Sequence, residues 1–467
     1  MEEFLMLPKL SCFKAYDIRG KVPGELDENL SYAIGMAYAR TIRPGAVVVG
    51  YDVRLESLGL AKSLIKGLNA TGVRVIDIGL CGTEEVYFHT FDREHQGVGG
   101  GIMITASHNP KGYNGMKLVR ENSIPLSGEA GLTEIHDWVV QNSTQIAKDD
   151  LKGAIDFRLT QKDDDKTRYI EHLLSYIKLD HLKPLKIVVN PGNGAAGLVV
   201  KLLEKHLPFE FIYVNEIPDG NFPNGVPNPL LPENRAATAN AVREHQADMG
   251  IAWDGDFDRC FLFDERGDFI EGYYVVGLLA AAFLKKYPNE KIVHDPRLTW
   301  NTEDIVLQSG GLPIQSKTGH AFMKARMRSE NAVYGGEMSA HHYFRNFAYC
   351  DSGMIPWLLI AELMVLSQKP LSTMVSERIK AYPCSGELNY TVVDAKETIK
   401  TIFEYYSPLS NKVDYTDGLS LEFDDWRFNL RSSNTEPLLR LNVESRSNVD
   451  LVAQRVDEIE RMIRTIS

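Results

Sequence analysis

Short apolar runs alternate with longer amphipathic segments along most of the chain. Residues 46–50 (AVVVG) predict a buried strand, residues 58–72 (LGLAKSLIKGLNATG) an amphipathic helix that ends at a glycine, and residues 73–79 (VRVIDIG) the next strand. A further strand is predicted at residues 101–105 (GIMIT). Because these strands lack polar alternation, they are typical of a mostly parallel sheet with helices on both faces.

The same pattern restarts twice further along the chain. Additional strands are predicted at residues 185–190, 249–255, 291–295 and 332–337, with a helix at residues 197–207. From residue 383 onward the strands are longer and alternate between apolar and polar residues. That alternation is typical of an antiparallel sheet with helices on one side.

The expected fold class is therefore α/β, with three tandem α/β domains of mixed, mostly parallel sheets and a C-terminal α+β domain. We place the four domains at residues 1–155, 156–266, 267–382 and 383–467. No low-complexity tract or long linker separates them, so we expect the domains to be arranged around one central cleft.

Polar motifs follow the predicted strands at the points where the strands end. In chain order they are TASHNP (105–110), DGDFDR (254–259), HDPR (294–297), KTGH (317–320) and GEMSAHH (336–342). In open α/β sheets, ligands bind outside the carboxyl ends of the strands. We therefore expect these motifs to contribute to the functional site.

Ser107 follows the strand at 101–105 and is a candidate nucleophile. The alternative is a polar turn, because Ser, Asn and Pro are common turn residues. A serine hydrolase is disfavoured because the GxSxG elbow is absent. His108 is adjacent, but along an extended chain consecutive side chains point to opposite sides, so we do not expect its ring to face Ser107. Lys117 lies on a predicted return strand, NGMKLV.

Asp254, Asp256 and Asp258 alternate in the loop after the strand at 249–255. In a curved loop these carboxylates can converge on one hard cation, which relieves the repulsion among three close negative charges. Magnesium prefers such oxygen ligands and leaves room for phosphate oxygens. Arg259 beside them is suited to bind a phosphate bidentately. The open alternatives are a solvated acidic turn and an aspartyl-phosphate phosphatase, whose motif requires a threonine that is missing here.

Two further loops carry hydrogen-bonding groups suited to a sugar phosphate. Glu337 and Ser339 lie two positions apart, and on an extended segment their side chains point to one side, which suits two neighbouring sugar hydroxyls. Arg431 opens the donor-rich stretch RSSNTEP (431–437), which is suited to wrap a phosphate dianion. A plain hairpin loop would have a similar composition, so both interpretations of RSSNTEP stay open.

Composition and charge disfavour several classes of function. The chain has 467 residues, 44% hydrophobic and 24% charged, with a formal net charge of −12. Nucleic-acid binding is disfavoured because no basic run occurs. The N-terminal sequence has no apolar signal-like region, and the longest apolar stretch, Val275–Leu284, is too short to span a bilayer. Five cysteines without CxxC spacing argue against a disulfide framework, so we expect a cytoplasmic protein.

In this order and spacing, TASHNP, DGDFDR, GEMS and RSSNTEP resemble the motifs of the α-D-phosphohexomutase family. The similarity runs from YDIRG (16–20) to the final predicted strands, and longer stretches such as GGEMSAHHYFRNFAYCDSGMIPW most resemble the bacterial phosphomannomutases of that family. The resemblance implies four domains around one cleft, three of them α/β domains of similar topology. It also implies Mg²⁺ as cofactor and a phosphoserine enzyme.

Carried over position by position, the resemblance assigns roles to residues of this sequence. Ser107 would be phosphorylated, and a phosphoserine oxygen would hold the Mg²⁺ together with Asp254, Asp256 and Asp258. The transferring phosphoryl group would be surrounded by Arg19, His108, Lys117 and Arg259. The catalytic acid and base would come from Lys117 and His341. The other substrate-binding residues would be Tyr16, Arg297, His320, Glu337, Ser339, Arg431, Ser433, Asn434 and Thr435.

Two positions depart from the family pattern. Arg297 stands where relatives often carry lysine, which keeps the charge but changes the geometry. Ala340 stands where glycine is common, so we expect its methyl group to shift the sugar loop slightly.

The implied reaction is the interconversion of hexose 6-phosphate and hexose 1-phosphate through a hexose 1,6-bisphosphate, with mannose as the hexose and GDP-mannose synthesis downstream. A phosphoglucomutase or dual-specificity enzyme is the first alternative, because Glu337 and Ser339 would bind hydroxyls that mannose and glucose share. A Mg²⁺-dependent sugar phosphatase and a non-catalytic sugar-phosphate-binding protein are more distant alternatives. We expect small hexose phosphates as partners, no nucleic acid or membrane, and a monomer or weak dimer.

Overall fold

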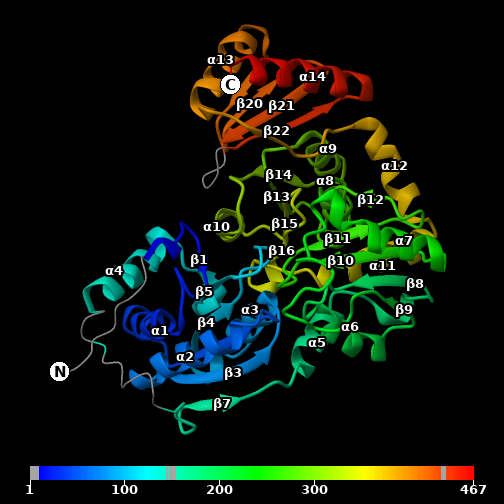
Figure 1. Cartoon of the computed structure of the whole chain (residues 1–467). Coiled ribbons are helices and arrows are strands. Elements are labelled where there is room, and N and C mark those ends of the chain that lie inside the picture. The colour runs from blue at the N-terminus through cyan, green and yellow to red at the C-terminus, as the bar shows by residue number, and fades with distance from the viewer. Residues whose placement is uncertain (1–9, 143–145, 147–153, 433–437, 467) are drawn as a thin grey trace. The chain divides into compact units, whose positions relative to one another are not determined.

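The computed structural model describes residues 10–142, 146, 154–432 and 438–466. The chain divides into two compact units, whose elements are labelled in Figure 1. The first unit comprises residues 1–269 and 346–366, and the second comprises residues 270–345 and 367–467.

The first unit begins with a mixed sheet. Its strands, in spatial order, are β1 (Ile18–Lys21), β5 (Tyr113–Arg120), β4 (Val98–Ile104), β2 (Ala46–Tyr51), β3 (Arg74–Leu80) and β7 (Thr160–Lys162), and β6 (Ile124–Pro125) pairs with β5. β2 runs parallel to β3 and β4, whereas β5 runs antiparallel to β1 and β4. The antiparallel β5 is the return strand that carries Lys117, as predicted.

Helices cover both faces of this sheet. They are α1 (Glu28–Ile42), α2 (Ser57–Ala70), α3 (Thr83–Asp92) and α4 (Leu132–Asn142). Along β2, Val47 and Val49 pack into a cluster with Leu64 of α2, while Val48 between them packs with Val86 of α3. Both faces of the strand are therefore apolar, which explains the continuous hydrophobic run in the sequence.

Close contact between α1 and α2 depends on two glycines. A Cβ atom on Gly35 would lie 2.4 Å from the carbonyl oxygen of Leu64, and one on Gly67 would lie 2.1 Å from that of Tyr32. α1 starts at Asp27, whose side chain accepts a hydrogen bond of 2.7 Å from the backbone N–H of Leu30 as an N-cap. The N-cap therefore sets the start of α1, and the two glycines allow the backbones of α1 and α2 to lie close together.

The second sheet of the first unit carries the acidic loop. Its strands are, in order, β12 (Phe269–Ile270), β11 (Cys260–Phe263), β10 (Met249–Trp253), β8 (Lys186–Asn190) and β9 (Glu210–Tyr213). β10 and β9 run parallel to β8, and β11 runs antiparallel to β10. The remaining elements of the first unit are α5 (Thr167–Leu174), α6 (Ala196–Leu203), α7 (Ala236–His245), the short strand β17 (Cys350–Asp351), which does not belong to this sheet, and α11 (Ile355–Ser367).

The second unit also contains two sheets. The first has the order β14 (Leu312–Gln315), β13 (Lys291–His294), β15 (Tyr334–Gly336) and β16 (His342–Phe344), with β13 parallel to β14 and β15. Its helices are α8 (Gly272–Lys286), α9 (Trp300–Gln308), α10 (His320–Glu330) and α12 (Leu371–Ala381).

The other sheet of the second unit is entirely antiparallel, as predicted for the C-terminal region. Its order is β18 (Leu388–Thr391), β22 (Leu438–Ser445), β21 (Trp426–Ser432), β20 (Leu419–Glu422) and β19 (Lys412–Asp414). α13 (Ala395–Tyr406) and α14 (Val449–Ile466) lie along this sheet and bury Ile402 and Ile459 against Phe428 (Figure 1). The predicted α/β class with mixed sheets and a C-terminal α+β region is confirmed, while the exact domain boundaries stay a prediction.

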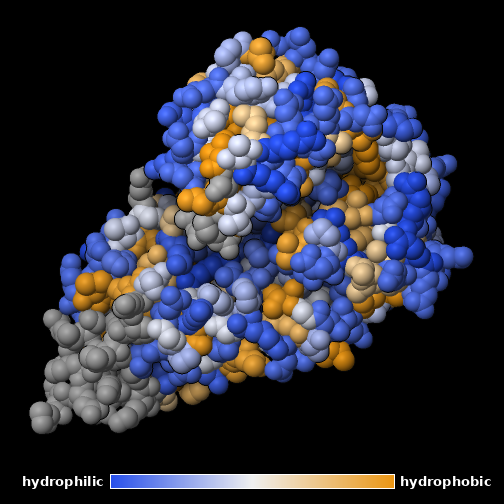
Figure 2. Space-filling view, turned by 45° about the horizontal axis from the view of Figure 1, so that its top comes forward, coloured by the Kyte–Doolittle hydropathy of each residue, from blue (hydrophilic) through white to orange (hydrophobic). Residues whose placement is uncertain are grey.

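Among the described residues, no single helix is long and apolar enough to cross a membrane. Only α11 and α12 together pass such a test, as a pair bent by 97°, and most of α11 is buried in the protein. Figure 2 shows a mainly hydrophilic face in which apolar residues form small scattered groups.

Candidate active site

The loop after β4 holds Ser107 in an unusual backbone conformation. Ser107 has a φ of 49°, in the left-handed region that non-glycine residues rarely adopt, and its side chain is buried. Thr105 fixes this turn, because its hydroxyl accepts a hydrogen bond of 2.9 Å from the Ser107 N–H and donates one of 2.7 Å to Asp52. The sequence motif therefore forms a constrained loop at a strand end.

Arg54 stabilises the same loop and was not singled out from the sequence. Its guanidinium donates to the backbone carbonyl oxygens of Ser107 (2.7 Å), Asn109 (2.6 Å), Pro110 (3.1 Å) and Tyr113 (2.9 Å). The sequence carries one signal for it, since YDVR (51–54) at the end of β2 has the same pattern as YDIR (16–19).

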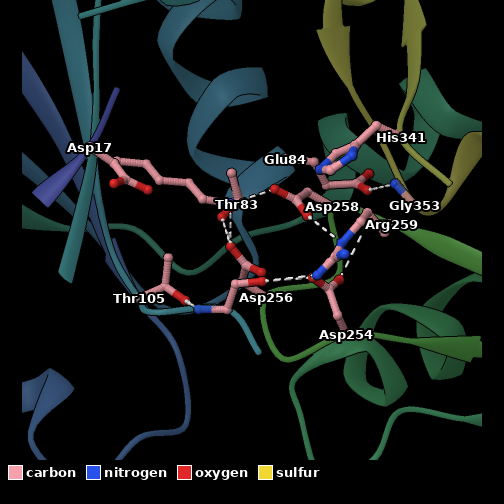
Figure 3. Close-up of polar contacts among 12 residues, drawn as sticks. Asp17, Thr83, Glu84, Thr105, Asp254, Asp256, Asp258, Arg259, His341 and Gly353 are labelled. Atoms are coloured by element: carbon pink, nitrogen blue, oxygen red, sulfur yellow. Dashed lines mark hydrogen bonds and ion pairs between the residues drawn. The ribbon is translucent and has the colours of Figure 1, made fainter. Parts of the chain in front are cut away.

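The acidic loop between β10 and β11 meets the serine loop. The hydroxyl of Ser107 donates a hydrogen bond of 2.7 Å to Oδ2 of Asp254. Asp254, Asp256 and Asp258 are buried, and one carboxylate oxygen from each lies within 4.8 Å of the others (Figure 3). A Cβ atom on Gly255 would lie 2.5 Å from the Ser107 carbonyl oxygen, so only glycine permits this approach.

Two cationic side chains contact the acidic cluster. Lys117 donates to Oδ2 of Asp256 at 2.7 Å and also to Asp258, and Arg259 donates to Oδ2 of Asp254 at 2.6 Å. Burial alone would lower the pKa of Lys117, but Asp256 and Asp258 outweigh it and raise the pKa above its ordinary value. Lys117 is therefore an ammonium group at neutral pH.

The donor set fits a hard divalent cation. All three carboxylates offer oxygen atoms, the ligands that Mg²⁺ prefers. Burial is the largest cause that raises the pKa of Asp254, and the neighbouring carboxylates add to it. Oδ1 of Asp256 is buried and has no hydrogen-bond partner among the described residues. A cation bound among these oxygens would reduce the repulsion between the three carboxylates and would give Oδ1 of Asp256 a partner.

His108 lies against Ser107, which corrects the expectation that its ring would face away. Its Nδ1 is 3.0 Å from Oγ of Ser107 and also contacts the Arg259 guanidinium. The expectation failed because it assumed an extended chain, whereas Ser107 is left-handed. Burial, followed by the charges of Arg259 and Arg19, holds the pKa of His108 well below its ordinary value. The ring is therefore neutral, and its Nδ1 accepts from Arg259.

Arg19 lies at the edge of the serine loop. It donates to Asp17 at 2.8 Å and to the side-chain oxygen of Asn109 at 2.7 Å. Tyr16, a predicted substrate-binding residue, is half-buried in the same unit just before β1. Its predicted partner Arg431 belongs to the second unit, so that pairing stays a prediction.

In the second unit, Glu337 and Ser339 converge on Arg297. Arg297 is held bidentately by Asp295 at 2.8 and 3.1 Å. One of its nitrogens lies 3.3 Å from Oγ of Ser339 and 3.7 Å from Oε1 of Glu337. Nδ1 of His341 lies 3.3 Å from the same hydroxyl.

The backbone at residues 337–340 differs from the prediction. Residues 338–340 form a turn after β15 and not an extended segment, so Glu337 and Ser339 approach one another through the turn. Ala340 has a φ of 68°, which explains why glycine suits this position. Glu337 accepts hydrogen bonds from Tyr343 (2.5 Å) and from the N–H of Gly319 (2.9 Å), the residue before His320 at the start of α10.

Glu387 joins two of the predicted substrate-binding arginines and was missed in the sequence. Its carboxylate accepts from Arg431 at 2.7 Å and lies 3.4 Å from Arg297 and 3.5 Å from Arg440. Burial would raise the pKa of Glu387, but the three arginines lower it below its ordinary value. Three further predicted residues, Ser433, Asn434 and Thr435, lie outside the described residues.

The chain matches four family models in succession. They are described as phosphoglucomutase/phosphomannomutase alpha/beta/alpha domain I (residues 11–145), domain II (167–267), domain III (271–382) and C-terminal domain (387–462).

Individual relatives are similar over nearly their whole length. A protein described as phosphohexose mutases from Xanthomonas campestris pv. campestris is 60% identical, covering 97% of this chain and 99% of the relative. An Escherichia coli phosphomannomutase is 56% identical, covering 98% and 100%. The crystal structure of a phosphoglucomutase/phosphomannomutase family protein from Burkholderia thailandensis superposes with a TM-score of 0.85 at 30% identity, covering 98% of both chains.

Proposed function

Because the chain belongs to the phosphoglucomutase/phosphomannomutase family, we infer that it is a phosphomannomutase, an isomerase that interconverts mannose 6-phosphate and mannose 1-phosphate. The observation that carries this inference is the contact of Ser107 with the acidic loop. A buried hydroxyl in a constrained loop lies 2.7 Å from one of three converging carboxylates, and Lys117 and Arg259 contact those carboxylates.

Ser107 is proposed as the residue that carries the phosphoryl group. In the first step the anomeric hydroxyl of mannose 6-phosphate attacks the phosphorus of phosphoserine 107, and the bond between phosphorus and the serine oxygen breaks. The products are mannose 1,6-bisphosphate and a free serine, which takes up one proton. The bisphosphate then reorients. In the second step Oγ of Ser107 attacks the phosphorus of the 6-phosphoryl group, the bond between that phosphorus and O6 of the sugar breaks, and O6 takes up a proton while the serine hydroxyl loses one. The products are mannose 1-phosphate and phosphoserine 107.

The cationic side chains support this transfer by positioning and by charge. Asp254, Asp256 and Asp258, with a phosphoserine oxygen, are the residues that would hold Mg²⁺. When bound, the ion would neutralise charge on the transferring phosphoryl group. Arg259 would bind a phosphoryl oxygen on Ser107, which its contacts with Asp254 and His108 support.

Lys117 is proposed as the acid that returns a proton to the serine oxygen. Its ammonium form at neutral pH and its place beside the acidic cluster suit this role. His341 is proposed as the base that accepts the proton of the attacking hydroxyl. Arg19 and His108 would complete the phosphoryl site, with His108 neutral and in contact with Arg259.

Most of the proposed substrate contacts come from residues of the second unit. Glu337 and Ser339 would bind the 3- and 4-hydroxyls of the hexose, with Arg297 and His320 beside them. Arg431 would hold the phosphate that does not react. Tyr16, Ser433, Asn434 and Thr435 complete this proposed set. Because the two hydroxyls are common to mannose and glucose, a dual-specificity hexose phosphomutase is the second candidate.

Several broader properties belong to the same proposal. The hexose 1,6-bisphosphate would serve as intermediate and activator, and the product would feed GDP-mannose synthesis. We propose a cytoplasmic monomer or weak dimer with domains at residues 1–155, 156–266, 267–382 and 383–467. The free thiols of all five cysteines support a reducing compartment.

A coupled assay tests the proposed function. The purified protein, primed with hexose 1,6-bisphosphate, is given mannose 1-phosphate or glucose 1-phosphate, and both hexose 6-phosphate and free phosphate are measured. We expect hexose 6-phosphate to form with little free phosphate. We also expect kcat/KM to be higher for mannose 1-phosphate than for glucose 1-phosphate. Ser107→Ala should abolish turnover, whereas Ser175→Ala, on the exposed end of α5, should retain it. Phosphate release as the main reaction would favour a phosphatase.

A further inference from the structure

The first residue of α3, Thr83, reaches the acidic loop although 173 positions separate it from Asp256. The hydroxyl of Thr83 donates a hydrogen bond of 2.5 Å to Oδ2 of Asp256 (Figure 3). The backbone N–H of Thr83 also donates to the carbonyl oxygen of Asp256 at 3.0 Å. Thr83 is fully buried, so these bonds are shielded from water.

The two oxygens of Asp256 have different surroundings. Oδ2 accepts hydrogen bonds from both Thr83 and Lys117, whereas Oδ1 is buried without a hydrogen-bond partner among the described residues. Buried carboxylate oxygens in native proteins are normally satisfied. The two donors on Oδ2 therefore fix the rotation of the carboxylate and leave Oδ1 available to a ligand.

We propose that Thr83 is a positioning residue for the site of the divalent cation. By donating to Oδ2, Thr83 would orient the Asp256 carboxylate so that Oδ1 points toward the acidic cluster. This inference rests on the proposed function only in its identification of the cation site. Thr83 would not touch the cation or the phosphoryl group. Partners of this kind, which hydrogen-bond a metal ligand, typically contribute 10–100-fold to metal affinity, and we expect a contribution of about that size.

The start of α3 is anchored independently of the Thr83 hydroxyl. Gly82 packs against the ring of Phe257, where an added Cβ atom would lie 2.3 Å from the ring. Glu84 accepts hydrogen bonds from Tyr169 (2.5 Å) and from the N–H of Gly353 (2.6 Å). Removing the hydroxyl alone should therefore leave the helix in place, which makes Thr83→Val a suitable probe.

The test is direct binding of Mn²⁺, as a substitute for Mg²⁺, to the full-length protein, measured by calorimetry and by electron paramagnetic resonance. Thr83→Val removes the hydroxyl at nearly constant volume, and Thr83→Ser keeps it. Thr90→Val is the matched control, since Thr90 is also buried on α3 but its hydroxyl donates to the Val86 carbonyl oxygen. Unfolding midpoints in urea are measured for every variant.

We expect the Mn²⁺ Kd of Thr83→Val to rise roughly 10–100-fold, that of Thr83→Ser to stay within about threefold of the unmodified protein, and that of Thr90→Val to be unchanged. Wild-type affinity in Thr83→Val, or an equal loss in Thr90→Val, would overturn the proposal. Failure of the unmodified protein to bind Mn²⁺ would instead overturn the metal site of the proposed function. The two failures are therefore distinguishable.

Discussion

The hydroxyl of Ser107 donates a 2.7 Å hydrogen bond to the carboxylate of Asp254, 147 positions away in the chain. This contact joins the loop after β4 of one sheet to the loop after β10 of another within the first unit. It depends on a left-handed Ser107 and on Gly255, which lets the two backbones approach. The serine loop and the acidic loop thus meet within the first unit.

Asp256→Asn should reduce turnover by roughly 10²–10³-fold, because a neutral amide is a poor ligand for a divalent cation and leaves Lys117 with one carboxylate fewer. The folded state should persist, since the amide has nearly the same volume. Turnover and far-ultraviolet circular dichroism are measured together. Asp268→Asn, an exposed carboxylate, serves as control and should behave as the unmodified protein. Full activity of the unmodified enzyme in excess EDTA would contradict the metal assignment.

Arg54→Lys should destabilise the protein by about 2–4 kcal/mol, because one ammonium group cannot replace a guanidinium that donates to four carbonyl oxygens. Turnover should fall as well, since the serine loop loses its fixed backbone. Urea unfolding measures the first effect and the mutase assay the second. Arg158→Lys removes an exposed guanidinium and should change neither. Unchanged stability of Arg54→Lys would show that the loop holds its own conformation.

The contribution of Glu84 to the free energy of unfolding should fall as the pH rises. Burial raises its pKa from 4.5 to about 8, despite hydrogen bonds from Tyr169, Ser352, Gly353 and Met354. Between pH 4.5 and about 8, Glu84 is mostly protonated in the folded protein and mostly ionised in the unfolded chain. The stabilising contribution of Glu84 is therefore complete below pH 4.5 and is lost as the pH rises through about 8.

Glu84→Gln removes this dependence while keeping the contacts. Its amide oxygen can accept from the backbone N–H groups, and its NH₂ group can donate to the two hydroxyls. The free energy of unfolding of the unmodified protein minus that of Glu84→Gln should therefore decrease from pH 5 to pH 8. Glu134→Gln, on the exposed side of α4, is the control. A difference that stays constant over this range would refute the assignment.

Glu387→Gln should strengthen binding of inorganic phosphate several-fold. The carboxylate of Glu387 contacts Arg431 and Arg297, so it competes with an anion for both guanidinium groups and repels it at short range. Calorimetric titration of phosphate at constant ionic strength measures the change. Weaker phosphate binding would mean that Glu387 serves mainly to orient the arginines.

The strand ends and their polar motifs could be predicted because apolar runs and the residues that follow them are local features of the sequence. Asp254, Asp256 and Asp258 were found in this way, since alternation in one loop suffices to suggest convergence. The four bonds of Arg54 could not be predicted, because they go to backbone carbonyl groups and have no complementary side chain in the sequence; the only signal was the similarity of YDVR (51–54) to YDIR (16–19). Thr83 was missed because its partner lies 173 positions away.

Local backbone conformation accounts for the remaining differences. His108 faces Ser107 only because Ser107 has a positive φ, and this conformation cannot be predicted from the residue type, since serine rarely adopts it. Glu337 and Ser339 meet through a turn that contains the left-handed Ala340, and the prediction assumed an extended segment. The structure therefore corrects the predicted backbone conformation at both places, while the roles of these residues stay predictions.

The most direct test of the account is the phosphorylation state of Ser107 during turnover. The protein is treated with hexose 1,6-bisphosphate, desalted, and its intact mass and peptide map are recorded before and after addition of mannose 6-phosphate. The account predicts one phosphoryl group, located on Ser107, that passes to the sugar when mannose 6-phosphate is added, and none on Ser107→Ala. Turnover by a protein that never carries phosphate on Ser107, or equal turnover by Ser107→Ala, would contradict it.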